Sequence, residues 1–203
     1  MKTLLKTLFF ATLVGVIAGC NDLNEIDSQV ENLSLKKGLK EPGMVTVPFK
    51  ADLVGEYQAY YFPGMPEFTC SDEFKCQVIV DAEGTATHMG KVTAHFDFCA
   101  CGPPNPDIEN VSDKYGPAEV SLIAANGDKL FLVVEGYVVT GNLDYHPEDV
   151  WSYWKDEYII TGGTGRFDGA TGTLMTDDYN STSYPENSFH HWSGTITMKT
   201  GRE

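Results

Sequence analysis

The feature of this chain that most restricts its fold is a two-residue repeat of apolar side chains. Between Lys91 and Phe98, valine, alanine and phenylalanine alternate with charged and polar residues, and the same alternation runs from Val47 to Leu53. Successive side chains of a β-strand point to opposite faces, so this pattern is typical of a strand that is buried on one side. No long segment of the sequence has the 3.6-residue repeat of an amphipathic helix.

Turn-forming residues separate further strand-like segments. Asn126-Gly127 lies between two apolar runs, and both residue types tolerate the positive φ that a two-residue hairpin needs. Further strands are predicted at residues 77–81, 120–123, 130–139, 151–161, 169–177 and 189–199. About eight strands in a domain of this length predict an all-β fold, either an antiparallel barrel or a sandwich, over residues 45–203.

The N-terminus has the pattern of a targeting segment. Lys2 and Lys6 precede an apolar run of about ten residues, whereas a membrane-spanning helix needs about 20. The run ends in Ala18-Gly19-Cys20, which resembles the signal of bacterial lipoproteins. The resemblance implies a signal peptide at residues 1–19, cleavage before Cys20, and a membrane anchor of acyl chains such as palmitate on that cysteine. The alternative is an ordinary signal peptide with a chance cysteine.

The segment after the cysteine indicates a location and excludes some partners. Residues 20–44 are polar and predict a flexible tether. Asn21, rather than an aspartate, follows Cys20, which in such lipoproteins favours the outer membrane, facing either the periplasm or the cell surface. The formal net charge of −15 argues against a nucleic acid partner, because nucleic acids require a basic surface. We expect contact with the membrane through the lipid anchor alone.

The most glycine-rich stretch is GGTGRFDGATG at residues 162–172. A dinucleotide-binding loop needs a third glycine where Asp168 stands, and the lysine of a phosphate-binding P-loop is absent. We therefore predict a structural turn in which the glycines have positive φ and Phe167 closes the end of a hydrophobic core. The glycines of this predicted turn are Gly162, Gly163, Gly165 and Gly169.

This stretch also resembles the GGTG-x-F-x-x-A-x-G turn of dirigent proteins and the related turn of allene oxide cyclases. Residues 86–93 and 124–131 resemble bacterial secreted members of the same barrel group, and the three segments occur in the same order. The resemblance covers residues 45–200 and implies an eight-stranded, calycin-like antiparallel β-barrel with a central cavity. Related barrels often form dimers or trimers, so a homo-oligomer is left open.

Fold alone does not carry an activity across. Dirigent proteins guide the coupling of phenoxy radicals, and allene oxide cyclases close a ring in an oxidised fatty acid. The residues that these activities use have no identifiable counterpart in this sequence.

Four cysteines remain after Cys20, and an envelope location permits disulfides between them. We predict two bridges that fix the loop between Cys70 and Cys76 to the strand end that carries Cys99 and Cys101, with the pairing left open. The alternatives are free thiols, or a zinc site that includes His95 and Asp97. The spacings differ from the usual C-x2-C pairs, and we expect no metal or other cofactor.

The candidate ligand-binding residues are those on apolar strand faces that would line a barrel cavity. They are Leu130, Leu132, Val134, Val138, His190 and Trp192. The first hypothesis is a non-catalytic binder of a small apolar or aromatic ligand. The alternatives are a surface scaffold for protein interactions, and an enzyme of the cyclase or isomerase kind in which His190 handles a proton. More often such a histidine is simply hydrogen-bonded in a core.

Overall fold

A computed structural model describes residues 43–182 and 187–200. The predicted signal peptide, Cys20 and the tether up to residue 42 lie outside the described residues. Within the described residues, no helix has the length and apolar character needed to cross a membrane.

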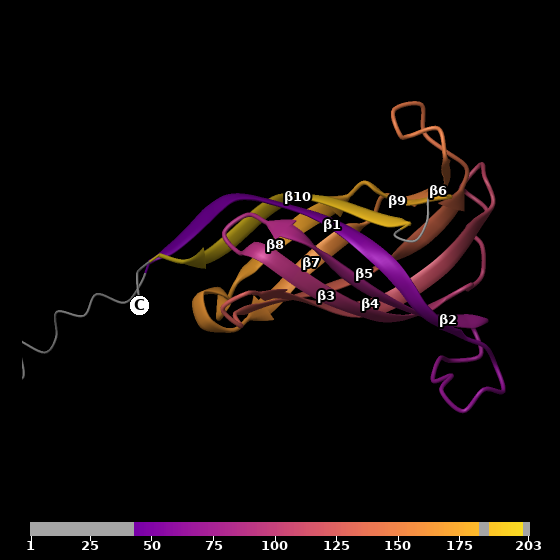
Figure 1. Cartoon of the computed structure of the whole chain (residues 1–203), viewed down its shortest axis with the longest axis horizontal. Helices are drawn as coiled ribbons and strands as arrows, with labels where there is room; N and C mark the ends of the chain where they lie inside the picture. Colours follow the sequence, from indigo (N-terminus) through magenta and orange to yellow (C-terminus); the bar gives the residue numbers. More distant parts are fainter. Residues whose placement is uncertain (1–42, 183–186, 201–203) are drawn as a thin grey trace, which may run out of the picture. The chain divides into compact units, whose positions relative to one another are not determined.

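Eight antiparallel strands form a closed ring (Figure 1). Each strand pairs with the next along the chain, except that β5 pairs with β7 and β8 pairs with β10. The ring closes where β10 runs along β1, from Met44 opposite Lys199 to Gly55 opposite Ser188. Its members are β1 (Met44–Tyr61), β2 (Cys76–Ala86), β3 (Gly90–Ala100), β4 (Ser112–Ala124), β5 (Lys129–Thr140), β7 (Glu157–Gly163), β8 (Thr171–Thr176) and β10 (Ser188–Lys199). The predicted eight-stranded antiparallel barrel is thus confirmed.

Two short strands extend the barrel wall between β5 and β10. β6 (Val150–Trp154) pairs with the end of β5 and with β9 (Asp178–Ser181), and β9 pairs with the start of β10. The prediction of one strand over residues 151–161 is therefore wrong, because the chain leaves the ladder at Lys155 and Asp156. Burial continues to alternate through this break, so the sequence pattern could not reveal it.

The inward-facing residues fill most of the barrel. The largest fully buried apolar side chains are Trp192, Phe49, Phe167, Leu53, Leu122, Leu130, Leu132, Leu174 and Ile196. They come from five strands and from the 3-10 turn η2 (Gly165–Phe167), which follows β7. Long-range strand pairing brings these residues together in one core.

The glycine-rich turn lies at one end of the barrel (Figure 1). Gly162, Gly165 and Gly169 have φ of 147°, 59° and 72°, and Phe167 has 0% exposure. Gly163 differs from the prediction because its φ is not positive. It is required for space instead, since a Cβ there would lie 2.3 Å from the carbonyl oxygen of Lys129.

We expect Gly163→Ala to lower the free energy of unfolding by about 2–3 kcal/mol, because the added methyl meets backbone that cannot move aside. Gly169→Ala is the matched control: a Cβ there meets nothing within 4 Å, and only the left-handed φ opposes it. Its expected cost is about 1–2 kcal/mol. Urea denaturation of both variants measures the difference, and equal costs would contradict the steric role of Gly163.

Candidate functional site

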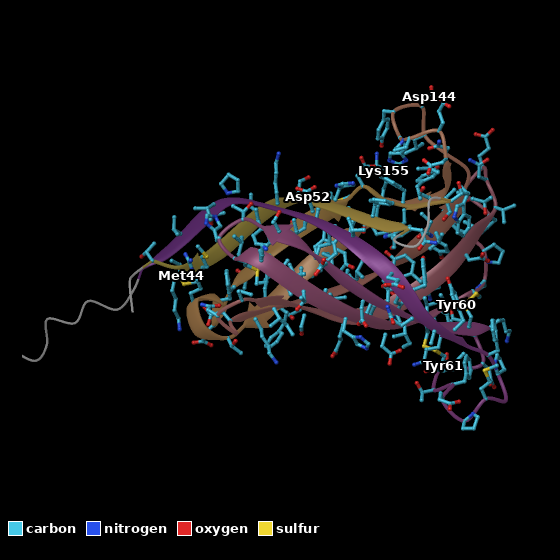
Figure 2. The ribbon with its side chains drawn as sticks, in the orientation of Figure 1. Met44, Asp52, Tyr60, Tyr61, Asp144 and Lys155 are labelled. Carbon is cyan, nitrogen blue, oxygen red and sulfur yellow. A yellow bond between two sulfur atoms is a disulfide. The ribbon has the colours of Figure 1, made fainter. Side chains whose placement is uncertain are left out.

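Two disulfides hold the loops at the opposite end of the barrel. Cys70 is bonded to Cys99 and Cys76 to Cys101, with Cα separations of 5.6 and 5.5 Å. The prediction of two bridges from the 70–76 loop to the end of β3 is confirmed. Figure 2 shows Tyr60 and Tyr61 beside this loop and Met44 at the other end of β1.

The disulfides bear on the zinc alternative, because all four sulfurs are used in covalent bonds. His95 and Asp97 are exposed on the outer face of β3, where His95 Nδ1 lies 2.7 Å from an oxygen of Asp81. Among residues 43–182 and 187–200, no three or more His, Cys, Asp or Glu side chains are grouped so as to hold a metal ion.

A cavity of about 50 Å³ lies inside the barrel at the disulfide end. Six aromatic side chains line it: Tyr57, Phe96, Phe98, Tyr115, Trp154 and Tyr158. Tyr57, Phe98 and Val138 are the lining residues that keep partial exposure, so they form its mouth. Besides the tyrosine hydroxyls, the polar groups of the lining are the side chains of Asn180, Ser188 and His190.

Three of the six candidate ligand-binding residues line the cavity, and the other three lie in the packed core of the barrel. Val134, Val138 and His190 line the cavity. The side chains of Leu130, Leu132 and Trp192 also point inward, but they belong to the fully packed core beneath it. Strand alternation identifies the inner face of a strand and not the level at which the interior is open.

Asp178, which sequence reasoning missed, anchors the polar side of the cavity. It is the first residue of β9 and has 0% exposure. One carboxylate oxygen accepts hydrogen bonds from His190 Nδ1 at 2.9 Å and from Trp192 Nε1 at 3.0 Å. The other accepts the backbone N–H of His191 at 2.8 Å. A buried carboxylate is tolerated when its oxygens are satisfied in this way.

His190 lies between the Asp178 carboxylate and the cavity. Its Nε2 lies 2.9 Å from the hydroxyl oxygen of Ser188, on the same inward face of β10. The imidazole stacks on Phe96 at a ring-centroid distance of 4.9 Å, and Trp154 packs edge-on at 5.8 Å. The ring is therefore held both by its hydrogen bonds and by packing.

A second hydrogen-bond chain runs along the neighbouring wall. The Tyr57 hydroxyl donates to Asn180 Oδ1 at 2.7 Å, and Asn180 Nδ2 donates to the Ser152 hydroxyl at 3.0 Å. Burial raises the pKa of Tyr57 well above its usual value, so this phenol stays protonated and remains a donor at neutral pH.

Gly55 leaves the space in which Ser188 and His190 meet. It is paired with Ser188 across the β1–β10 ladder. A Cβ at this position would lie 3.2 Å from the Ser188 Cβ and 3.3 Å from His190 Nε2. The absence of a side chain at residue 55 therefore shapes the polar corner of the cavity.

A second carboxylate, Asp156, lies where β6 and β7 separate. The Tyr115 hydroxyl donates to it at 2.8 Å, and burial raises the pKa of the Asp156 carboxyl to about 6. The folded protein consequently binds more protons than the unfolded chain between about pH 4 and 6, where an unfolded aspartate is already ionised.

We therefore expect the Asp156 contribution to make the free energy of unfolding decrease as pH rises from about 4 to 6, with the loss complete above that range. Asp156→Asn keeps an acceptor for Tyr115 and removes the titration. Urea denaturation at pH 4.5 and pH 7 should show a smaller decrease for Asp156→Asn than for the unaltered protein. The same pH dependence in both proteins would contradict the role of this carboxyl.

The solved structures to which the chain is similar include two pterocarpan synthase dirigent proteins. The first is 15% identical with a TM-score of 0.43, over 81% of this chain and 90% of its own. The second is 13% identical with a TM-score of 0.42, over 81% of this chain and 100% of its own. Neither a protein-family model nor a curated protein matches the sequence. The strand pairing shows that the chain forms an eight-stranded antiparallel β-barrel. No residue role is taken from these neighbours.

Proposed function

We propose that the barrel binds a small aromatic molecule that carries one hydrogen-bonding group. The observation that supports this proposal is the cavity at the disulfide end, with its aromatic lining and a polar corner at Ser188 and His190. Binding sites for small molecules are commonly apolar, with a few polar groups that fix the orientation of the ligand.

The size of the cavity restricts the ligand. A dry cavity of about 150 Å³ accepts benzene, whereas this one measures about 50 Å³. A single ring can enter only if the side chains at the mouth, Tyr57 and Phe98, move outward. We therefore propose a one-ring ligand that inserts its polar end and leaves the rest at the mouth, rather than a large hydrophobic molecule.

The binding test uses phenol and toluene as probes, with amide chemical shifts of the 43–203 domain as the readout. Phenol should shift resonances around the cavity, and toluene, which has the same shape without the hydroxyl, should bind more weakly. Val134→Phe fills the cavity and should abolish the shifts. The matched control, Val133→Phe, faces outward on the same strand and should leave them intact. Unshifted spectra with phenol, or equal binding by Val134→Phe, would overturn the proposal.

We also propose that the protein acts at the cell envelope, held by acyl chains on Cys20. The support is the sequence of the first twenty residues, and the polar segment that follows would separate the barrel from the membrane. The test is expression of the full chain in a bacterium fed an alkyne-tagged palmitate. The unaltered chain should be labelled and fractionate with membranes, whereas Cys20→Ala should carry no label. Equal labelling of the two chains would contradict the anchor.

A further inference from the structure

We propose that Ser188 is the nucleophile of an acyl-transfer site that hydrolyses esters of short acyl chains, with His190 as its base and Asp178 as the positioning residue. The inference rests on the proposed function in one respect, namely that the cavity admits a small molecule. It goes beyond binding because it assigns a covalent step to the polar corner.

The first argument is the order of the three side chains. A serine hydroxyl becomes nucleophilic when a histidine takes its proton and a third group orients the histidine. Here the Ser188 hydroxyl lies 2.9 Å from His190 Nε2, and His190 Nδ1 lies 2.9 Å from the Asp178 carboxylate. When Nδ1–H donates to the carboxylate, a neutral imidazole presents the Nε2 lone pair to the Ser188 hydroxyl.

The second argument is access. Ser188 and His190 line the cavity, while Asp178 is sealed behind them in the core. A purely structural serine–histidine–aspartate chain would have no need of a cavity at its serine end. The bare backbone of Gly55 lets Ser188 and His190 pack closely against β1, because a Cβ there would lie 3.2 Å from the Ser188 Cβ and 3.3 Å from His190 Nε2.

The third argument is a donor for the charge that develops on the ester oxygen. The Tyr57 hydroxyl belongs to a side chain that lines the same cavity as Ser188, and it stays protonated because burial raises its pKa. In the resting protein it donates to Asn180, 2.7 Å away. A tyrosine hydroxyl turned toward the substrate is one of the groups that stabilise such an oxyanion.

The reaction then balances with water as the co-reactant. The Ser188 oxygen forms a bond to the ester carbonyl carbon while its proton passes to His190 Nε2. The ester C–O bond breaks, and the leaving alcohol takes the proton from His190. Water attacks the acyl-serine, gives a proton to His190 and releases the acid, and His190 returns that proton to the Ser188 oxygen. No oxidant or metal is required.

The cavity sets the substrate class. A space of about 50 Å³ accepts an acetyl-sized acyl group rather than a fatty acyl chain. The aromatic side chains at the mouth, Tyr57 and Phe98, would contact an aromatic leaving group. Phenyl acetate has both parts and is the probe of choice.

The experiment treats the 43–203 domain with a small fluorophosphonate and follows the intact mass, alongside the release of phenol from phenyl acetate. The domain should gain one adduct at Ser188 and release phenol above the buffer rate. Ser188→Ala should lose both signals. The matched control is Ser193→Ala, which removes an exposed serine on the outer face of the same strand, β10, and it should keep both.

The role of Asp178 is tested by the rate of adduct formation in Asp178→Asn, measured at a temperature where circular dichroism shows the variant folded. A positioning role predicts a rate at least about 100-fold lower, a change that a purely structural contact would not produce in the folded protein. An unmodified wild-type domain, or equal labelling of Ser188→Ala, would overturn the inference. Phenol binding without any adduct would leave the proposed binding function intact and remove only the acyl-transfer step.

Discussion

Replacing Asp178 with alanine is expected to lower the free energy of unfolding by about 3–5 kcal/mol, the range found when one partner of a buried charged network is removed. The substitution leaves three donors without their acceptor: His190 Nδ1, Trp192 Nε1 and the backbone N–H of His191. The carboxylate is fully buried, so no solvent is positioned to replace it.

The neighbouring Asp177 provides the control for this substitution. It lies on the outer face, where it accepts a hydrogen bond from Tyr145 and pairs with Lys155. Ion pairs at the surface contribute about 0–1 kcal/mol, so Asp177→Ala should cost no more than about 1 kcal/mol. Urea denaturation of both variants measures the contrast. A loss at residue 178 no larger than that at residue 177 would show that the buried network contributes little to stability.

The barrel could be predicted from the sequence because its signals are local. The alternation from Lys91 to Phe98 and the Asn126-Gly127 turn each specify one strand or one hairpin. Closure of the ring has no local sequence signal, because it depends on pairing between Met44 and Lys199, at opposite ends of the domain. The residues alone left a barrel and a sandwich open, and the resemblance of the glycine-rich turn favoured the barrel.

The site was predicted only in part, and the reasons are specific. His190 was found because it lies on the apolar face of its strand. Ser188 and Asp178 were missed because the predicted strands began at residue 189 and ended at residue 177, one residue short in each case. The alternation of Leu174, Thr176 and Asp178 does place a carboxylate on the inner face, and this signal was available in the sequence.

The disulfide pairing could not be obtained from spacing. Cys99 and Cys101 lie two residues apart, and either could have reached Cys70 or Cys76. The pairing follows from how the 70–76 loop returns across the end of β3, which is set by the β2–β3 register that places Cys76 opposite Ala100. Long-range register of this kind is a property of the folded sheet rather than of any local pattern.

Phe167→Ala is expected to cost about 3–5 kcal/mol, which is the usual cost of removing a buried phenylalanine. Its ring has 0% exposure and belongs to the same hydrophobic core as Leu130, Leu174 and Ile196. Phe131 is the matched control, because it is partly exposed on β5, and its replacement by alanine should cost roughly 1 kcal/mol. Urea denaturation measures both values.

Phe167→Ala also tests whether packing at one end of the barrel affects ligand binding at the other end. Phe167 lies in the η2 turn after β7. The cavity is lined by residues near the disulfide loops, at the other end of the barrel. Phe167→Ala should therefore weaken folding and leave phenol-induced chemical shifts unchanged in the fraction that remains folded. If Phe167→Ala lowers the free energy of unfolding by only about 1 kcal/mol, the Phe167 ring does not contribute to the core as a buried phenylalanine should. Lost phenol binding in the folded variant would instead show that the packed half of the barrel determines the shape of the cavity.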